Sequence, residues 1–177
     1  MLQYALAGQG LPMPLPVFAP AQPAFVFDLL CQQPTLQVTP LAPGQTFSLG
    51  SLDIATCAGV HPVPSLAYRW QTAAGAFIYS GDTNEAPALA EFAQGAAVLL
   101  CDAGVMETAW TPQCPHLSPL RAGRLARQAG VRRLLLTHFG PGQDPDAAVR
   151  EARQVFPETY ATQRLATYDA NGSCTSA

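Results

Sequence analysis

The hydrophobic pattern divides the chain into a strand-rich first half and a second half in which helices and strands alternate. In the first half, short apolar or alternating runs predict strands at residues 14–20, 36–39, 66–72 and 75–80, and a short helix at 24–31. Residues 46–56 predict a hairpin that turns at Gly50 and Ser51. Residues 2–6 are typical of the end of a helix, which Gly8 and Gly10 stop.

In the second half, start and stop residues mark the helices. Asn84 predicts the cap of a helix through Gln94, and Ser118 followed by Pro119 predicts the start of a helix that ends at Gly130. Asp144 predicts the cap of a last helix to about Val155. Strands are predicted at residues 96–102 and 131–137, and a final strand at 159–162 and 165–168 before a polar tail.

This order of elements predicts an α/β (α+β) fold, a sheet with helices on its outer faces. A chain of 177 residues, 49% of them hydrophobic, can bury one full core. We therefore expect a single domain over residues 1–177. The helix after Ser118 is predicted to bury a stripe of four residues: Ala122, Leu125, Ala126 and Ala129. Three arginines lie off this stripe and are predicted to be solvated, with phosphate contact as the alternative: Arg121, Arg124 and Arg127.

Charge and composition narrow the classes of protein. The formal net charge is −3, and all nine basic residues are arginines. So acidic and lysine-free a chain lacks the broad basic surface of a nucleic-acid binder, although it can still grip one or two phosphates. No apolar run reaches the length of a membrane span, and the first residues lack the features of a signal peptide. We expect no membrane partner.

The five cysteines predict buried thiols in a reducing compartment. They are widely spaced, odd in number and include no Cys-x-x-Cys pair, so a disulfide framework is not expected. This predicts a cytoplasmic location. Cys114, two residues before His116, has a metal contact as a less favoured alternative.

Candidate chemistry concentrates at the ends of predicted strands. The chain has three histidines, and two of them, His61 and His138, follow apolar runs, as does Asp82. Because ligands bind at the carboxyl ends of strands in layered α/β folds, these three side chains predict a metal site at one edge of the sheet. The third histidine, His116, lies just before a predicted helix.

Some of these residues also have a structural alternative. Asp82 suits a turn that leads into Thr83, and His116 suits a loop that enters a helix. Asp102 ends a buried strand and is predicted to be structural, through a hydrogen bond to a loop. Glu107 is close enough in sequence to assist the chemistry, with no further support.

Segments 59–69, 79–83, 114–118 and 135–139, taken in order, resemble the metallo-β-lactamase superfamily, in particular its ribonuclease Z-like phosphodiesterase branch. The resemblance implies a four-layer αββα sandwich with two divalent metal ions, usually zinc and alternatively manganese, at one edge. It implies that His61 is a ligand of one metal, His138 a ligand of the other, and Asp82 the carboxylate that bridges both. His116 resembles the histidine near the scissile phosphate, which stabilises charge or moves a proton.

One part of the family pattern is absent. The His-x-His-x-Asp-His signature does not occur, and no histidine precedes His61. The resemblance therefore implies an N-terminally truncated domain, in which three donors are too few for two metals. We expect weak or no metal binding by this chain and little or no activity alone. Exposed sheet edges would favour a homodimer.

The expected function is a metal-dependent hydrolase acting on a small phosphodiester or ester, with RNA possible and not favoured. The alternative is a non-catalytic remnant of the fold that serves as a binding or assembly protein. Two histidines and a carboxylate can also form the iron site of an oxygenase, although the sequence shows no other oxygenase feature.

Overall fold

The computed structural model describes residues 13–169 and 171–176. The chain packs as two compact units, one ending at Ala42 and one beginning at Pro43. The prediction of a single domain over residues 1–177 stays a prediction. The helical end predicted at residues 2–6 lies outside the described residues.

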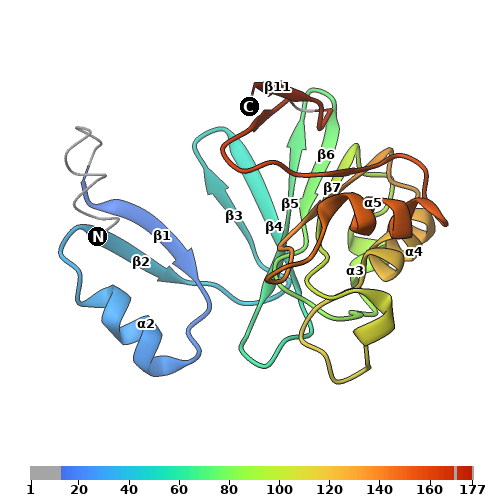
Figure 1. Cartoon of the computed structure of the whole chain (residues 1–177). Coiled ribbons are helices and arrows are strands. Elements are labelled where there is room, and N and C mark those ends of the chain that lie inside the picture. Colours follow the sequence, from blue (N-terminus) through green and yellow to red (C-terminus); the bar gives the residue numbers. More distant parts are fainter. Residues whose placement is uncertain (1–12, 170, 177) are drawn as a thin grey trace. The chain divides into compact units, whose positions relative to one another are not determined.

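The first unit is a two-stranded parallel sheet with one helix. β1 (Leu15–Ala19) pairs with β2 (Leu36–Pro40), with Leu15 opposite Leu36, and α2 (Ala24–Cys31) connects them (Figure 1). Prolines stand beside or within both strands, where the missing backbone N–H is tolerated at a sheet edge. All three elements were predicted.

The second unit contains a mixed sheet of seven strands. In order across the sheet they are β3 (Thr46–Leu49), β4 (Leu52–Ala58), β5 (Leu66–Thr72), β6 (Gly75–Tyr79), β7 (Val98–Asp102), β8 (Arg133–Thr137) and β9 (Thr159–Ala161). Pairing is antiparallel from β3 to β6 and parallel from β6 to β9. The first hairpin turns at Gly50, which has a φ of 60°, as the sequence predicts.

Helices α3 (Leu89–Phe92), α4 (Pro119–Ala129) and α5 (Pro145–Arg153) lie against the sheet, and a 3₁₀ turn, η1 (Glu107–Ala109), precedes α4 (Figure 1). The Ser118 side chain accepts a hydrogen bond from the Arg121 amide, and Gly130 ends α4 in a left-handed conformation. Asp144 caps α5 by accepting a hydrogen bond from the Asp146 amide. None of the helices described is long and apolar enough to cross a membrane.

The main core lies between the helices and one face of β6, β7 and β8. The strands contribute Ile78, Leu99, Cys101, Leu134 and Leu136, and α4 and α5 contribute Ala122, Ala126, Ala129, Ala148 and Ala152. The other face carries a smaller apolar cluster of Ala97, Val98 and Leu135 with Phe77, Leu100 and Tyr168. Burial on both faces explains why β7 and β8 are almost continuously apolar.

The helix predicted from Asn84 to Gln94 is wrong in its first half, because only Leu89–Phe92 is helical. The Asn84 side chain is used elsewhere. Its amide nitrogen lies 2.6 Å from the Cys114 carbonyl oxygen, and its amide oxygen accepts a hydrogen bond from the Trp110 indole at 3.0 Å. These contacts with a distant loop replace the cap.

The prediction of one final strand is also wrong. β9 ends at Ala161, and β10 (Thr167–Tyr168) pairs with β11 (Cys174–Ser176) in a separate two-stranded sheet. The chain turns between β9 and β10 at Leu165, which has a φ of 63°. The segment predicted as a polar tail thus forms a strand.

The mixed α/β class is confirmed. The second unit supplies one layer of helices and one layer of sheet. The four-layer arrangement and the N-terminal truncation stay predictions.

Candidate functional site

Four strands of the second unit point their carboxyl ends toward the same edge of the sheet. β4 and β6 both run antiparallel to β5, and β6, β7 and β8 run parallel to one another. His61 follows β4, Asp82 follows β6, Asp102 ends β7 and His138 follows β8. The topology therefore gathers these side chains at one edge.

All three histidines meet there, and we refer to His61, His116 and His138 as the histidine cluster. The ring centroid of His116 lies 5.6 Å from that of His61 and 4.8 Å from that of His138. The Nδ1 atom of His138 lies 3.6 Å from Oδ1 of Asp82. The structure thus brings together the four residues that the sequence singled out, while their roles as ligands or catalyst stay predictions.

Asp102 holds His116 in place. Its side chain is 0% exposed, and Oδ2 lies 2.8 Å from Nδ1 of His116. The carboxylate also accepts hydrogen bonds from the Thr83 amide at 2.9 Å and the Gly104 amide at 2.8 Å. The predicted structural bond to a loop is present. The bond to His116 is additional, and it leaves the Nε2 atom of that ring available for other contacts.

Burial raises the pKa of Asp102, and the hydrogen bonds from Thr83, His116 and Gly104 oppose that rise. The charges of Asp102 and Asp82 also act on Tyr79. Burial is the largest cause that raises the pKa of this phenol, followed by the two carboxylates. The edge therefore has a negative character, which favours cations.

Two hydrogen bonds join the loop of His61 to the loop of Asp82. The Val60 amide donates to the Thr83 hydroxyl at 2.9 Å, and the Asn84 amide donates to the Val60 carbonyl at 2.8 Å. Gly81 has a φ of 62°, and a Cβ at this position would lie 2.6 Å from the Leu66 carbonyl oxygen. Only glycine allows this turn without strain.

His138 itself has an unusual backbone conformation, with a φ of 59°. A residue other than glycine in this region costs about 1–3 kcal/mol and persists where the surroundings enforce it, often at functional sites. Its side chain is 47% exposed and that of Asp82 is 38% exposed. Both groups are therefore open to a ligand.

Gly104 allows His116 to approach closely. A Cβ at residue 104 would lie 2.8 Å from Cγ of the His116 ring. Sequence reasoning missed both this contact and the bond between Asp102 and His116. The available signals were weak: an aspartate at the end of a buried strand, with a glycine two residues later.

The donor set fits a divalent ion in type and place, and falls short in number. Imidazole and carboxylate suit zinc, and carboxylate also suits manganese. Within residues 13–169 and 171–176, however, no three His, Cys, Asp or Glu side chains are arranged to hold a metal ion. His138 and Asp82 are a pair of exposed donors at this edge, 3.6 Å apart.

Two other candidates have structural contacts. Glu107 pairs with Arg121 at 3.1 Å and accepts a hydrogen bond from the Ser118 hydroxyl. The Cys114 thiol lies 3.3 Å from the Thr111 amide nitrogen. The prediction that Arg121 is solvated is wrong, because its side chain is only 16% exposed and is held by Glu107 and Glu85.

Comparison with known proteins identifies the class. Residues 7–139 match the family model of the beta-lactamase superfamily domain, which is more than half of the chain. The chain therefore belongs to this superfamily and is hydrolase-like, with a fold whose members bind divalent metals.

The match with each relative by sequence covers only part of that relative's length. The chain is 40% identical over 114 residues to the uncharacterized protein ML1173 of Mycobacterium leprae, which is 64% of this chain and 40% of that protein. It is 38% identical over 96 residues to the ribonuclease Z of Thermoplasma volcanium, covering 52% of this chain and 31% of that protein. The chain thus spans about two fifths or less of these relatives.

A solved structure confirms the fold. The metallo-beta-lactamase fold protein YhfI from Bacillus subtilis superposes with a TM-score of 0.82 at 24% identity, covering 92% of this chain and 67% of that chain. The match shows that the described chain follows the metallo-β-lactamase fold.

Proposed function

We propose that this chain acts as a metal-dependent hydrolase on a small phosphodiester or a related ester. The observation that supports this most is the meeting of three histidines and Asp82 at the carboxyl edge of the sheet. In this proposal His61 and His138 are ligands of two divalent ions, zinc first and manganese second. Asp82 would supply the anionic oxygens that two neighbouring cations need.

His116 is the proposed catalytic residue, and Asp102 positions it. The buried carboxylate fixes the ring through Nδ1, so that Nε2 can steady developing charge or move a proton. Divalent ions, when bound, polarise the ester and activate water. Asp102 does not touch the substrate in this scheme, since its side chain is fully buried.

The charge distribution supports a small substrate. The net charge of −3 and the absence of lysine disfavour a long polyanion. The relative named ribonuclease Z keeps RNA as the less favoured substrate. We also propose a cytoplasmic location and a homodimer. Three partly exposed apolar side chains on the second face of the sheet, Phe77, Leu100 and Tyr168, support association, which light scattering can measure.

We propose further that the chain alone binds metal weakly and has little or no activity. Catalytic zinc normally takes three protein ligands, and here three donors are divided between two ions. Metal binding is expected to be weak because the donors are too few, although their chemistry suits the metal.

The test measures metal content and hydrolysis of bis-p-nitrophenyl phosphate after addition of zinc or manganese. Asp82→Asn and His138→Ala remove donors, and Asp53→Asn is the control because Asp53 lies on the exposed first hairpin. We expect low metal uptake that the first two variants abolish and the control retains. Uptake or hydrolysis that survives both donor variants would contradict the assignment. Strong hydrolysis that requires His138 would support the function and contradict the proposed weakness of the chain alone.

A second candidate is a metal-free binding or assembly protein. One observation favours it: among the described side chains, no three donors are already arranged for a metal. No metal uptake by the native protein, at any zinc or manganese concentration tested, would select this candidate.

A further inference from the structure

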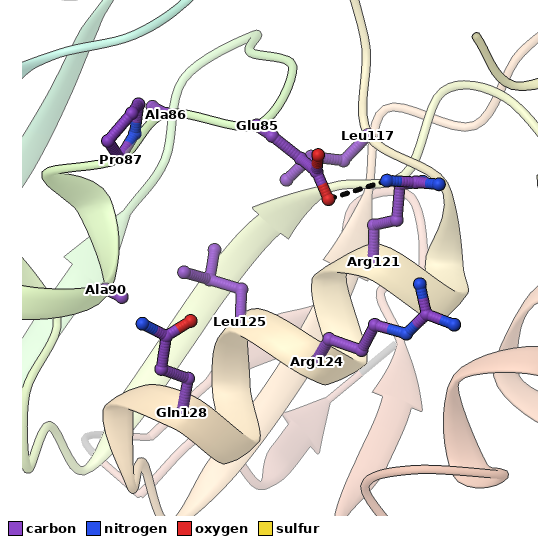
Figure 2. Close-up of a pocket in the computed structure, with 9 residues that line it drawn as sticks. All are labelled: Glu85, Ala86, Pro87, Ala90, Leu117, Arg121, Arg124, Leu125 and Gln128. Carbon is purple, nitrogen blue, oxygen red and sulfur yellow. Dashed lines mark hydrogen bonds and ion pairs between the residues drawn. The ribbon is translucent and has the colours of Figure 1, made fainter. Parts of the chain in front are cut away.

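A pocket of about 360 Å³ lies between α4 and the segment from Glu85 to Ala90 (Figure 2). None of the histidine cluster lines it. Its volume is in the range of small-ligand sites, about 300–1,000 Å³. The pocket combines an apolar floor with charged side chains.

The floor is formed by aliphatic side chains. Leu117 and Ala90 are buried, and Leu125 is half-buried on α4. Figure 2 shows Leu125 projecting from α4 between Arg124 and Gln128. This floor can cover a short apolar body and remove it from water.

The two arginines on the pocket wall, Arg121 and Arg124, differ in their partners. Arg121 pairs with the Glu85 carboxylate at 2.7 Å and with Glu107 at 3.1 Å. Its guanidinium also lies over the Trp110 ring, 3.1 Å from the centroid. The charge of Arg121 is therefore compensated, and Glu85, although 57% exposed, is already paired.

Arg124 has no such partner. It lies three residues after Arg121 and four before Gln128, so all three side chains share one side of α4 (Figure 2). Across the described part of the chain, neither Arg124 nor Gln128 makes a side-chain hydrogen bond or ion pair. Because two carboxylates already compensate Arg121, Arg124 is the cation on the pocket wall with which an anion can pair.

We propose that this pocket binds a small organic anion. The carboxylate or phosphate group of the ligand pairs with Arg124 and accepts a hydrogen bond from the Gln128 amide. The planar guanidinium suits both kinds of anion, because each can accept two parallel N–H bonds. The apolar body of the ligand lies against Leu117 and Leu125. The site needs no metal and is separate from the proposed hydrolytic function.

The test is calorimetric titration of the native protein without added metal, using three aromatic probes of similar size. Benzoate represents a carboxylate, phenyl phosphate represents a phosphate monoester, and benzamide is the uncharged control. We expect at least one anion to bind and benzamide to bind at least about tenfold more weakly, as loss of a charge-assisted hydrogen bond requires. Benzoate alone would assign a carboxylate ligand, and phenyl phosphate alone a phosphate ligand.

Variants locate the site. Arg124→Gln should weaken binding of the anion about tenfold or more. Arg127→Gln is the matched control, because Arg127 is exposed on the same helix and does not line the pocket. Gln128→Glu, which adds a negative charge beside Arg124, should weaken binding as well and provides a second test. No saturation with either anion, equal affinity for benzamide, or unchanged affinity in both pocket variants would overturn the proposal.

Discussion

The Nδ1 atom of His116 lies 2.8 Å from Oδ2 of Asp102, whose side chain is completely buried. The same carboxylate accepts hydrogen bonds from the amides of Thr83 and Gly104. Asp102 therefore joins three segments: the loop that carries Asp82, its own strand end, and the loop that carries His116. Asp102 therefore both stabilises the loops around the site and fixes the position of the His116 ring.

Replacing Asp102 by Ala should be strongly destabilising. The change leaves three buried or half-buried donors without an acceptor, each at about 1–3 kcal/mol, so we expect a loss of at least about 3 kcal/mol in the free energy of unfolding. Urea unfolding measures it. Asp53→Ala, on the exposed first hairpin, should change the same quantity by about 1 kcal/mol or less. Equal effects of the two variants would contradict the role of Asp102.

The raised pKa of Asp102 predicts a pH dependence. Burial lifts the folded-state pKa above the usual 3.8, so the ionised carboxylate costs the folded state stability when the pH is above the folded pKa. That cost disappears as the pH falls toward 3.8. The amide introduced by Asp102→Asn does not titrate, so the stability of the native protein relative to this variant should increase from pH 7 to pH 4. A difference that stays constant or decreases would show that the carboxylate is not destabilised by burial.

Gly81 and Gly95 form a matched pair that tests the turn into the site. Both have a positive φ, 62° at Gly81 and 65° at Gly95, but only at Gly81 would a Cβ meet backbone, the Leu66 carbonyl oxygen at 2.6 Å. Gly95→Ala should cost about 1 kcal/mol from its conformation alone. Gly81→Ala should cost at least about 2 kcal/mol more, because the backbone must also move. Thermal or urea unfolding of both variants provides the comparison, and similar losses would contradict the close approach.

The backbone of His138 predicts an unusual order of stability. With a φ of 59°, the position favours glycine, so His138→Gly should be about 1 kcal/mol more stable than His138→Ala, the reverse of the usual order of these two residues. Both variants lose the contact with Asp82, so that loss cancels in the comparison. If the alanine variant is the more stable, the left-handed conformation does not exist in solution.

Elements with local start and stop residues could be predicted from the sequence. Ser118, Pro119 and Gly130 define α4 through contacts within a few residues, and the helix has the predicted bounds. Asn84 shows the limit of this reasoning. Its side chain has the chemistry of a helix cap, but it binds Trp110 and Cys114, which are 26 and 30 residues away in sequence. Tertiary contacts of this kind leave no local pattern.

The candidate site also has one part that the sequence predicts and one part that it does not. The meeting of His61, Asp82 and His138 follows from strand ends and parallel direction, which a sequence pattern can indicate. The contact between Asp102 and His116 depends instead on how the loop from Gly104 to His116 returns to β7. The pairing of Arg121 with Glu85 likewise depends on packing between segments, so an arginine that the helical pattern predicted to be solvated is nearly buried.

All three histidines and Asp82 meet at one edge of the sheet, and paramagnetic broadening by Mn²⁺ tests most directly whether a metal binds there. Because the chain has three histidines, single substitutions can assign every imidazole C–H resonance in the proton spectrum. Small additions of Mn²⁺ should broaden all three resonances together, before those of other side chains, and Asp82→Asn should suppress the effect. Broadening of one histidine without the others, or of none, would contradict the account.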